Sequence, residues 1–83
     1  MNDTEQINTA RIVRVFNHGA NVQVMCADDL GLLSLYFRQE TFSLFNRDIH
    51  KAGLKLKDLP IQFDSRTVRI QDPVKKKVLS YKL

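Results

Sequence analysis

Arginines alternate with aromatic rings at strand spacing in the first half of this sequence. Side chains two residues apart on a strand point to the same face. A first strand therefore places Arg14 beside Phe16, and a third strand places Tyr36 beside Arg38. Aromatic rings stack on nucleobases, and arginine contacts phosphates or stacks on bases itself. These four side chains predict a face suited to a single-stranded nucleic acid.

The alternate positions of the same two strands predict the core. They are Val13 and Val15 in the first strand and Leu33, Leu35 and Phe37 in the third. The opposite set adds Ile12, Leu32 and Ser34 to the four side chains above. A one-residue change of register exchanges the two faces of a strand. The alternative is therefore that a helix covers the arginine and aromatic face, with Phe42 and Phe45 packed on Phe16 and Ile12.

A second candidate cluster is basic. Lys75, Lys76 and Lys77 follow Asp72 and Pro73 at a predicted hairpin tip, where lysines contact phosphates without reading sequence. The same lysines also fit a solvated turn that protects an edge strand from aggregation. Arg69 is predicted to join the first face if its strand pairs nearby.

Charge is unevenly distributed along the chain. The 83 residues include 13 Lys or Arg and 9 Asp or Glu, for a net charge of +4. Nine basic and three acidic residues lie from Lys51 onward, so this part carries +6 and the first 50 residues carry −2. A basic half favours a polyanion or an acidic protein partner.

Signatures of catalysis and of metal binding are missing. Cys26 is the single cysteine and the two histidines lack ligand spacing, so we expect no zinc site, no disulfide and no cofactor. We expect Cys26 to be a buried thiol. The sequence has neither a glycine-rich phosphate loop nor a nucleophile elbow, which argues against an enzyme. The polar N-terminus and the lack of a long apolar run favour a cytoplasmic protein outside the membrane.

The elements that position these residues follow from local patterns. We expect strands over 9–16, 21–27, 32–37, 61–64, 67–71 and 77–83, and a helix over 42–52. The helix has Thr41 as N-cap, an apolar stripe of Phe42, Phe45, Ile49 and Ala52, and Gly53 as its stop. Residues 1–8 are expected to be a flexible N-terminus, and 9–83 a single domain.

This order predicts a mainly β, α+β fold. Three strands, one helix and two or three further strands match a small antiparallel barrel with the OB-like order β-β-β-α-β-β. An SH3-like barrel is the alternative.

One short segment resembles a known motif. Asp48–Gly53 is similar to the Asp/Asn-x-Ser-x-x-Gly motif of the PilZ family, which binds cyclic di-GMP, but His50 stands in place of the serine. The family's second motif has two arginines separated by three residues, and Arg11 and Arg14 are separated by two. The helix interpretation accounts for Ala52 and Gly53 without this motif.

Two functions fit the sequence. The first is a non-enzymatic module that binds single-stranded DNA or RNA with little sequence preference. The second is a protein-interaction module that docks on an acidic protein surface, with Ile12, Phe16, Met25 and Tyr36 as its interface. A homodimer through an edge strand at 77–83 is compatible with both.

Overall fold

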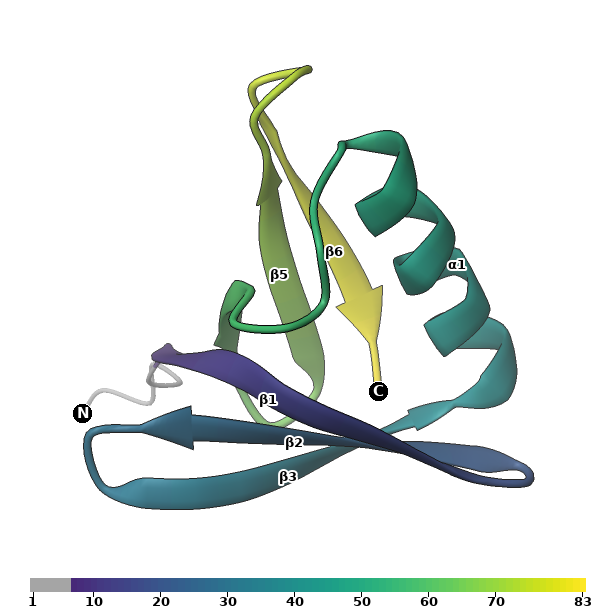
Figure 1. Cartoon of the computed structure of the whole chain (residues 1–83), viewed down its shortest axis with the longest axis vertical. Coiled ribbons are helices and arrows are strands. Elements are labelled where there is room, and N and C mark those ends of the chain that lie inside the picture. The colour runs from purple at the N-terminus through teal and green to yellow at the C-terminus, as the bar shows by residue number, and fades with distance from the viewer. Residues whose placement is uncertain (1–6) are drawn as a thin grey trace, which may run out of the picture.

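The computed structural model describes residues 7–83, which form one antiparallel sheet and one helix (Figure 1). The strands are β1 (Asn8–His18), β2 (Asn21–Asp28), β3 (Gly31–Arg38), β4 (Pro60–Phe63), β5 (Thr67–Asp72) and β6 (Lys77–Lys82), and the helix is α1 (Gln39–Lys51). The strand order in the sheet is β3-β2-β1-β4-β5-β6. The predicted α+β class is confirmed. Within the described residues β3 and β6 remain at the two edges, so the sheet is open and not closed into a barrel.

The sheet is bent, and the helix lies in the bend. β1, β2 and β3 form a ribbon that crosses the lower part of Figure 1, while β5 and β6 rise from it and α1 lies between the two parts. The bend follows from the pairing of β1. Its first residues, Asn8 to Arg11, pair with β4, whereas Arg14 to His18 pair only with β2.

Short turns position the strands of the lower ribbon. His18 pairs with Asn21, so the β1–β2 loop has two residues, and Gly19 has φ +77° there. Glycine at the first position of such a loop suits a turn whose twist matches the strands. Asp28 closes the β2–β3 turn, since its Oδ1 accepts hydrogen bonds from the N–H groups of Leu30 and Gly31. Both turns lie between the strands predicted over 9–16, 21–27 and 32–37.

The helix agrees with its predicted stripe but begins earlier. Phe45, Ile49 and Ala52 are buried. The N-cap is Arg38, without a side-chain capping bond, so the prediction of Thr41 as N-cap is wrong. The chain enters the helix directly from β3, and the N–H of Gln39 donates to the carbonyl of Ala20.

Gly53 ends the helix as expected. It has φ +73°. Its N–H donates to the carbonyl of His50, and the N–H of Leu54 donates to that of Ile49. This pair of bonds is a Schellman motif, which favours glycine because the left-handed conformation is strained for other residues.

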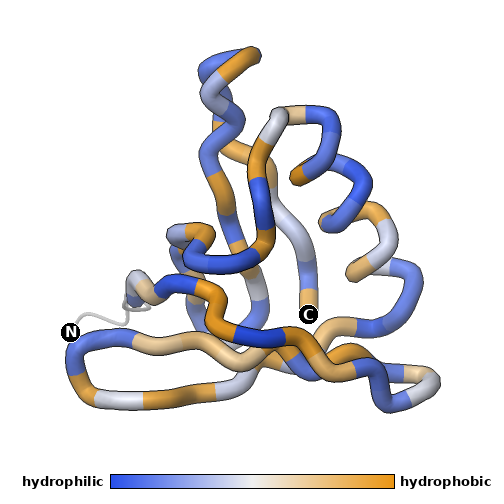
Figure 2. The backbone as a smooth tube through the Cα atoms, in the orientation of Figure 1, coloured by the Kyte–Doolittle hydropathy of each residue, from blue (hydrophilic) through white to orange (hydrophobic). Residues whose placement is uncertain are grey.

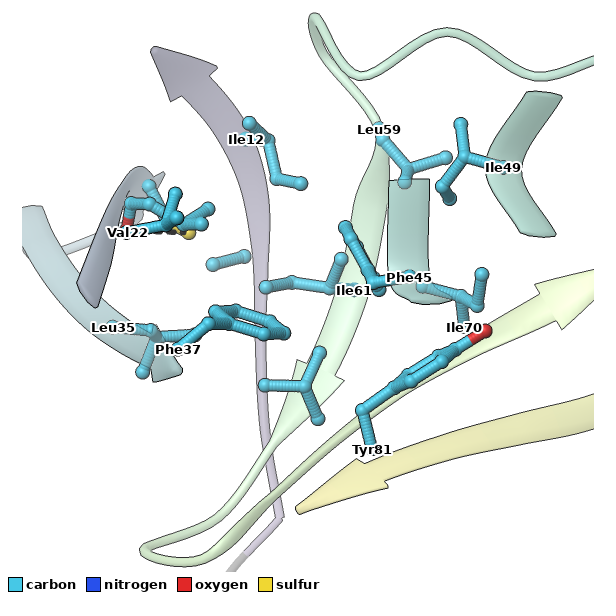
Figure 3. Close-up of a cluster of buried hydrophobic side chains, with 14 residues drawn as sticks. Ile12, Val22, Leu35, Phe37, Phe45, Ile49, Leu59, Ile61, Ile70 and Tyr81 are labelled. Carbon is cyan, nitrogen blue, oxygen red and sulfur yellow. Dashed lines mark hydrogen bonds between the residues drawn. The ribbon is translucent and has the colours of Figure 1, made fainter. Parts of the chain in front are cut away.

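One core joins the helix to both parts of the sheet. The ring of Phe45 lies 5.1 Å from that of Phe37 on β3 and 5.1 Å from that of Tyr81 on β6, measured between centroids (Figure 3). Figure 2 shows that hydrophobic and hydrophilic residues alternate along β5 and that both kinds occur along α1. The buried positions of β2 and β5, which include Val22, Val24, Cys26, Val68 and Ile70, agree with the predicted faces.

The predicted core face of β1 is wrong at its centre. Ile12 is 1% exposed and Val13 is 39% exposed, the reverse of the expectation. The register with β2 shifts between Ile12 and Arg14, so Val13 has no partner there. A bulge of this kind changes which parity faces the core. Ala10 and Ile12 face the core before it, and Val15 packs against the core after it.

The N-terminal boundary also differs from the prediction. Residues 1–6 of the expected flexible segment lie outside the described residues. Asn8 belongs to β1 and pairs with Phe63 of β4. The sheet therefore begins one residue earlier than predicted.

Candidate nucleic-acid interface

Arg14, Phe16, Tyr36 and Arg38 lie together on one face of the lower ribbon. The register aligns Phe16 with Gln23 and Gln23 with Tyr36, in a row across β1, β2 and β3. On either side of this row, Arg14 aligns with Met25 and Ser34, and His18 with Asn21 and Arg38. We call the side chains of these three rows the outer face.

The helix covers the opposite side of the ribbon. The ring of Phe42 lies 5.8 Å from that of Phe37, whose side chain is fully buried. Phe37 points away from the outer face because it alternates with Tyr36 and Arg38 along β3. The alternative in which Phe42 and Phe45 cover Phe16 is therefore wrong. Tyr36 is 56% exposed.

An arginine and two rings form a stack along β1. The guanidinium carbon of Arg14 lies 5.9 Å from the centroid of the Phe16 ring, within the range of a cation–π contact. On the other side, the His18 ring lies 6.4 Å from the Phe16 ring, with 25° between their planes. The stack is possible because all three residues follow the bulge and share one parity.

Gln23 connects the strands at the centre of the outer face. Its Oε1 lies 2.8 Å from Nε2 of His18, and its Nε2 donates to Oγ of Ser34 at 2.9 Å. These contacts hold the amide between Phe16 and Tyr36. His18 is a site residue that the sequence analysis missed, since the predicted first strand ends at Phe16, whereas β1 continues to His18. Continuing the parity of Arg14 and Phe16 by one step would have found it.

The charge of the outer face is positive. Arg14 and Arg38 lie on two of its rows, and its aligned positions hold no acidic residue. Arg11 precedes the bulge and is also exposed. Two ion pairs among the described residues, Arg47–Asp48 and Arg69–Asp64, lie on other elements.

Arg69 does not join this face. It lies on β5, where it pairs with Gln62 and Ser80, and β4 meets β1 only at the end away from Phe16. Its Nη1 lies 3.2 Å from Oδ2 of Asp64. Hydrogen bonds from the backbone N–H of Arg66, and further from Thr67 and Arg69, lower the pKa of Asp64. Arg69 instead lines a separate cavity of about 370 Å³.

Lys75 and Lys76 lie in the β5–β6 turn, and Lys77 begins β6. All three are exposed. Oδ1 of the buried Asp72 accepts hydrogen bonds from the N–H groups of Val74 and Lys75 and so shapes the turn. This hairpin tip projects from the end of the molecule opposite the lower ribbon (Figure 1). The structure therefore does not bring the lysines alongside the outer face.

Cys26 and Asp48 are both engaged within the fold. Cys26 is fully buried as predicted, and burial raises the pKa of its thiol to about 11. Asp48, in the segment that resembles the PilZ motif, lies in the last turns of α1 and accepts a 2.7 Å hydrogen bond from the Tyr81 hydroxyl.

Across residues 7–83, no three His, Cys, Asp or Glu side chains gather as metal ligands would. The described helix is too short to cross a membrane.

The chain matches no protein-family model, no curated protein sequence and no solved structure.

Proposed function

We propose that this chain is a non-catalytic module that binds single-stranded nucleic acid on its outer face. One observation carries the proposal: Arg14, Phe16, Tyr36 and Arg38 converge on a sheet face that the helix leaves uncovered. Solvated sheet faces are usually covered by uniformly polar side chains. An arrangement of rings between arginines instead offers stacking surfaces and phosphate contacts together.

The expected mechanism combines stacking with counterion release. Successive bases stack on Phe16 and Tyr36, at about 1–3 kcal/mol per base. Arg14 and Arg38, at the two sides of the aromatic row, contact the phosphates. Duplexes do not expose base faces for stacking, so single strands are favoured. Stacking tolerates any base, which predicts little sequence preference.

Fluorescence anisotropy tests the proposal. Labelled single-stranded and duplex DNA and RNA are titrated with the protein at low and at physiological salt. We expect single strands to bind more tightly than duplexes and to remain bound at physiological salt. Equal and salt-sensitive binding of all four ligands would reduce the interaction to general attraction by a basic protein and contradict the proposal.

Tyr36→Ala is the sharpest variant. Its ring is largely exposed, so the fold should be retained while affinity for single strands falls by about 1–3 kcal/mol. Leu44→Ala on α1 is a matched control, because Leu44 is 48% exposed and lies off the outer face. Phe16→Ala is a second variant. If both aromatic variants unfold, their rings have a packing role and the proposed stacking site is wrong.

A protein-interaction function is the second candidate. Leu32 is 69% exposed and Leu30 is 96% exposed at the end of the same ribbon, and exposed apolar side chains beside arginine are typical of interfaces. Ile12 was predicted to be part of this interface. It is buried in the structure and therefore does not contribute to an exposed surface. Stoichiometric recovery of one acidic protein, with no nucleic acid bound, would favour this candidate.

A further inference from the structure

The sheet has two edges, and they differ in how they are protected. β3 has the sequence Gly-Leu-Leu-Ser-Leu-Tyr-Phe-Arg, with one charge at its end, and its register with β2 is continuous. β6 has a lysine at each end and follows Lys75 and Lys76. Lysines, prolines and bulges are the usual protection of an edge against pairing. β3 has none of these.

The ladder determines which backbone groups of β3 point outward. The N–H of Gln39 donates to the carbonyl of Ala20. Hydrogen-bonded and non-bonded pairs alternate along an antiparallel ladder. The N–H and C=O groups of Leu32, Ser34 and Tyr36 therefore point away from β2, toward the open edge. Leu32 and Tyr36 are also the two large hydrophobic side chains of the strand that are exposed, at 69% and 56%.

We propose that β3 pairs antiparallel with β3 of a second copy of this chain, with Ser34 at the two-fold axis. This register brings the outward backbone groups of both strands opposite one another. It also places Leu32 beside Tyr36 of the second copy, on the same face of the sheet. Both apolar side chains become partly buried, as cross-strand pairs of this type favour.

Charge favours β3 over β6 as the contact. Two β6 strands would bring together four strand-end lysines and the Lys75 and Lys76 side chains of both copies. Two β3 strands paired about Ser34 keep Arg38 at opposite ends of the contact. The proposed dimer therefore uses the other edge of the sheet from the one at 77–83 that the sequence analysis considered.

The dimer extends the outer face across the contact. A two-fold axis perpendicular to the sheet leaves the outer faces of both copies on one side, so the Tyr36 rings of both copies lie on one surface. The dimer does not depend on nucleic-acid binding, and either proposal can fail alone. Dimer mass is measured without nucleic acid present.

Sedimentation equilibrium of the free protein is the first test. We expect a mass approaching twice the 9.6 kDa of one chain as concentration rises. Leu32→Lys should weaken dimerisation by roughly tenfold or more, because it adds an edge lysine in the contact. Val78→Lys is the matched control, since Val78 is 53% exposed on β6. A single-chain mass at every concentration, or dissociation caused by Val78→Lys alone, would overturn the proposal.

Cross-linking tests the register. In Ser34→Cys, a short bis-maleimide should join two chains efficiently, whereas Ser80→Cys on β6 should stay monomeric on a denaturing gel. The native Cys26 does not interfere because it is fully buried. Cross-linking at Ser80→Cys, or none at Ser34→Cys, would contradict the pairing of β3 even if Leu32→Lys disturbs the fold.

Discussion

The two parts of the sheet differ in what they expose. The β1–β3 ribbon exposes rings and arginines on a face that α1 leaves open, and it ends at an edge strand with one charge. The β5–β6 hairpin exposes lysines at its tip and along its edge. Most of the net positive charge of the chain thus lies away from its aromatic surface. Net charge alone points to the hairpin, whereas the binding site that we propose lies on the ribbon.

The comparison also separates two uses of basic residues. Arginines on the ribbon contact or flank rings, as Arg14 does with Phe16. Lysines on the hairpin lie on a turn shaped by Asp72. Guanidinium groups stack and form paired hydrogen bonds, whereas ammonium groups act as hydrated point charges. We infer that the arginines serve recognition and that the lysines keep the hairpin soluble and unpaired.

The largest effect is expected from removing the ring of Phe45, which contacts both parts of the sheet. Phe45→Ala should destabilise the fold by about 3–5 kcal/mol, because it leaves a cavity between Phe37 and Tyr81. Urea denaturation followed by circular dichroism measures this change in the free energy of unfolding. If the two parts unfold in separate transitions even in the native chain, a single core does not join them.

A double substitution on the ribbon tests its role in recognition. Arg14→Ala with Arg38→Ala should weaken single-strand binding by about tenfold or more. A plot of log affinity against log salt should become less steep, by about 0.7 in the size of its slope for each phosphate that an arginine no longer neutralises. Anisotropy titrations over a range of salt give both values. An unchanged slope would show that these arginines do not contact phosphates.

The contact between helix and hairpin predicts a pH-dependent effect. The hydrogen bond from Tyr81 lowers the pKa of Asp48. The ionised carboxylate therefore stabilises the fold at any pH above the ordinary pKa of an aspartate. This contribution is lost as pH falls through the lowered pKa. Tyr81→Phe should therefore cost about 1 kcal/mol at neutral pH and less in acid. Urea denaturation at several pH values measures it, and a cost independent of pH would argue against the pair.

The smallest effect is expected at the hairpin tip. Replacing Lys75, Lys76 and Lys77 with glutamine should change stability by less than about 0.5 kcal/mol, because all three side chains are exposed. Affinity for single strands should fall less than in the Arg14 and Arg38 double variant. A larger decrease of affinity from the tip than from the ribbon would reverse the comparison between the two parts.

Much of the fold could be predicted because its signals are local. The helix stripe of Phe45, Ile49 and Ala52 depends only on helical periodicity, and Gly53 stops the helix through its own backbone freedom. Alternation along β2 and β5 identified their buried faces. The start of the helix at Gln39 was missed because no capping side chain marks it. The gathering of Arg14, Phe16, Tyr36 and Arg38 was also predicted, since it needs only parity and neighbouring hairpin strands.

Local patterns in the sequence were enough to predict the elements, most of their buried faces and which residues share a face of a strand. Three further features depend on contacts between distant segments and could not be predicted in this way. At the bulge around Val13, β1 pairs with β2 and also bonds to the loop before β4, where the carbonyl of Leu59 accepts from the N–H of Ile12. The helix packs on the side of the ribbon where the Phe45 ring contacts both Phe37 and Tyr81. The bend of the sheet places Arg69 and the three lysines away from the outer face. The positions of charges in the sequence could not predict this separation, because the packing of the elements sets which residues lie close together.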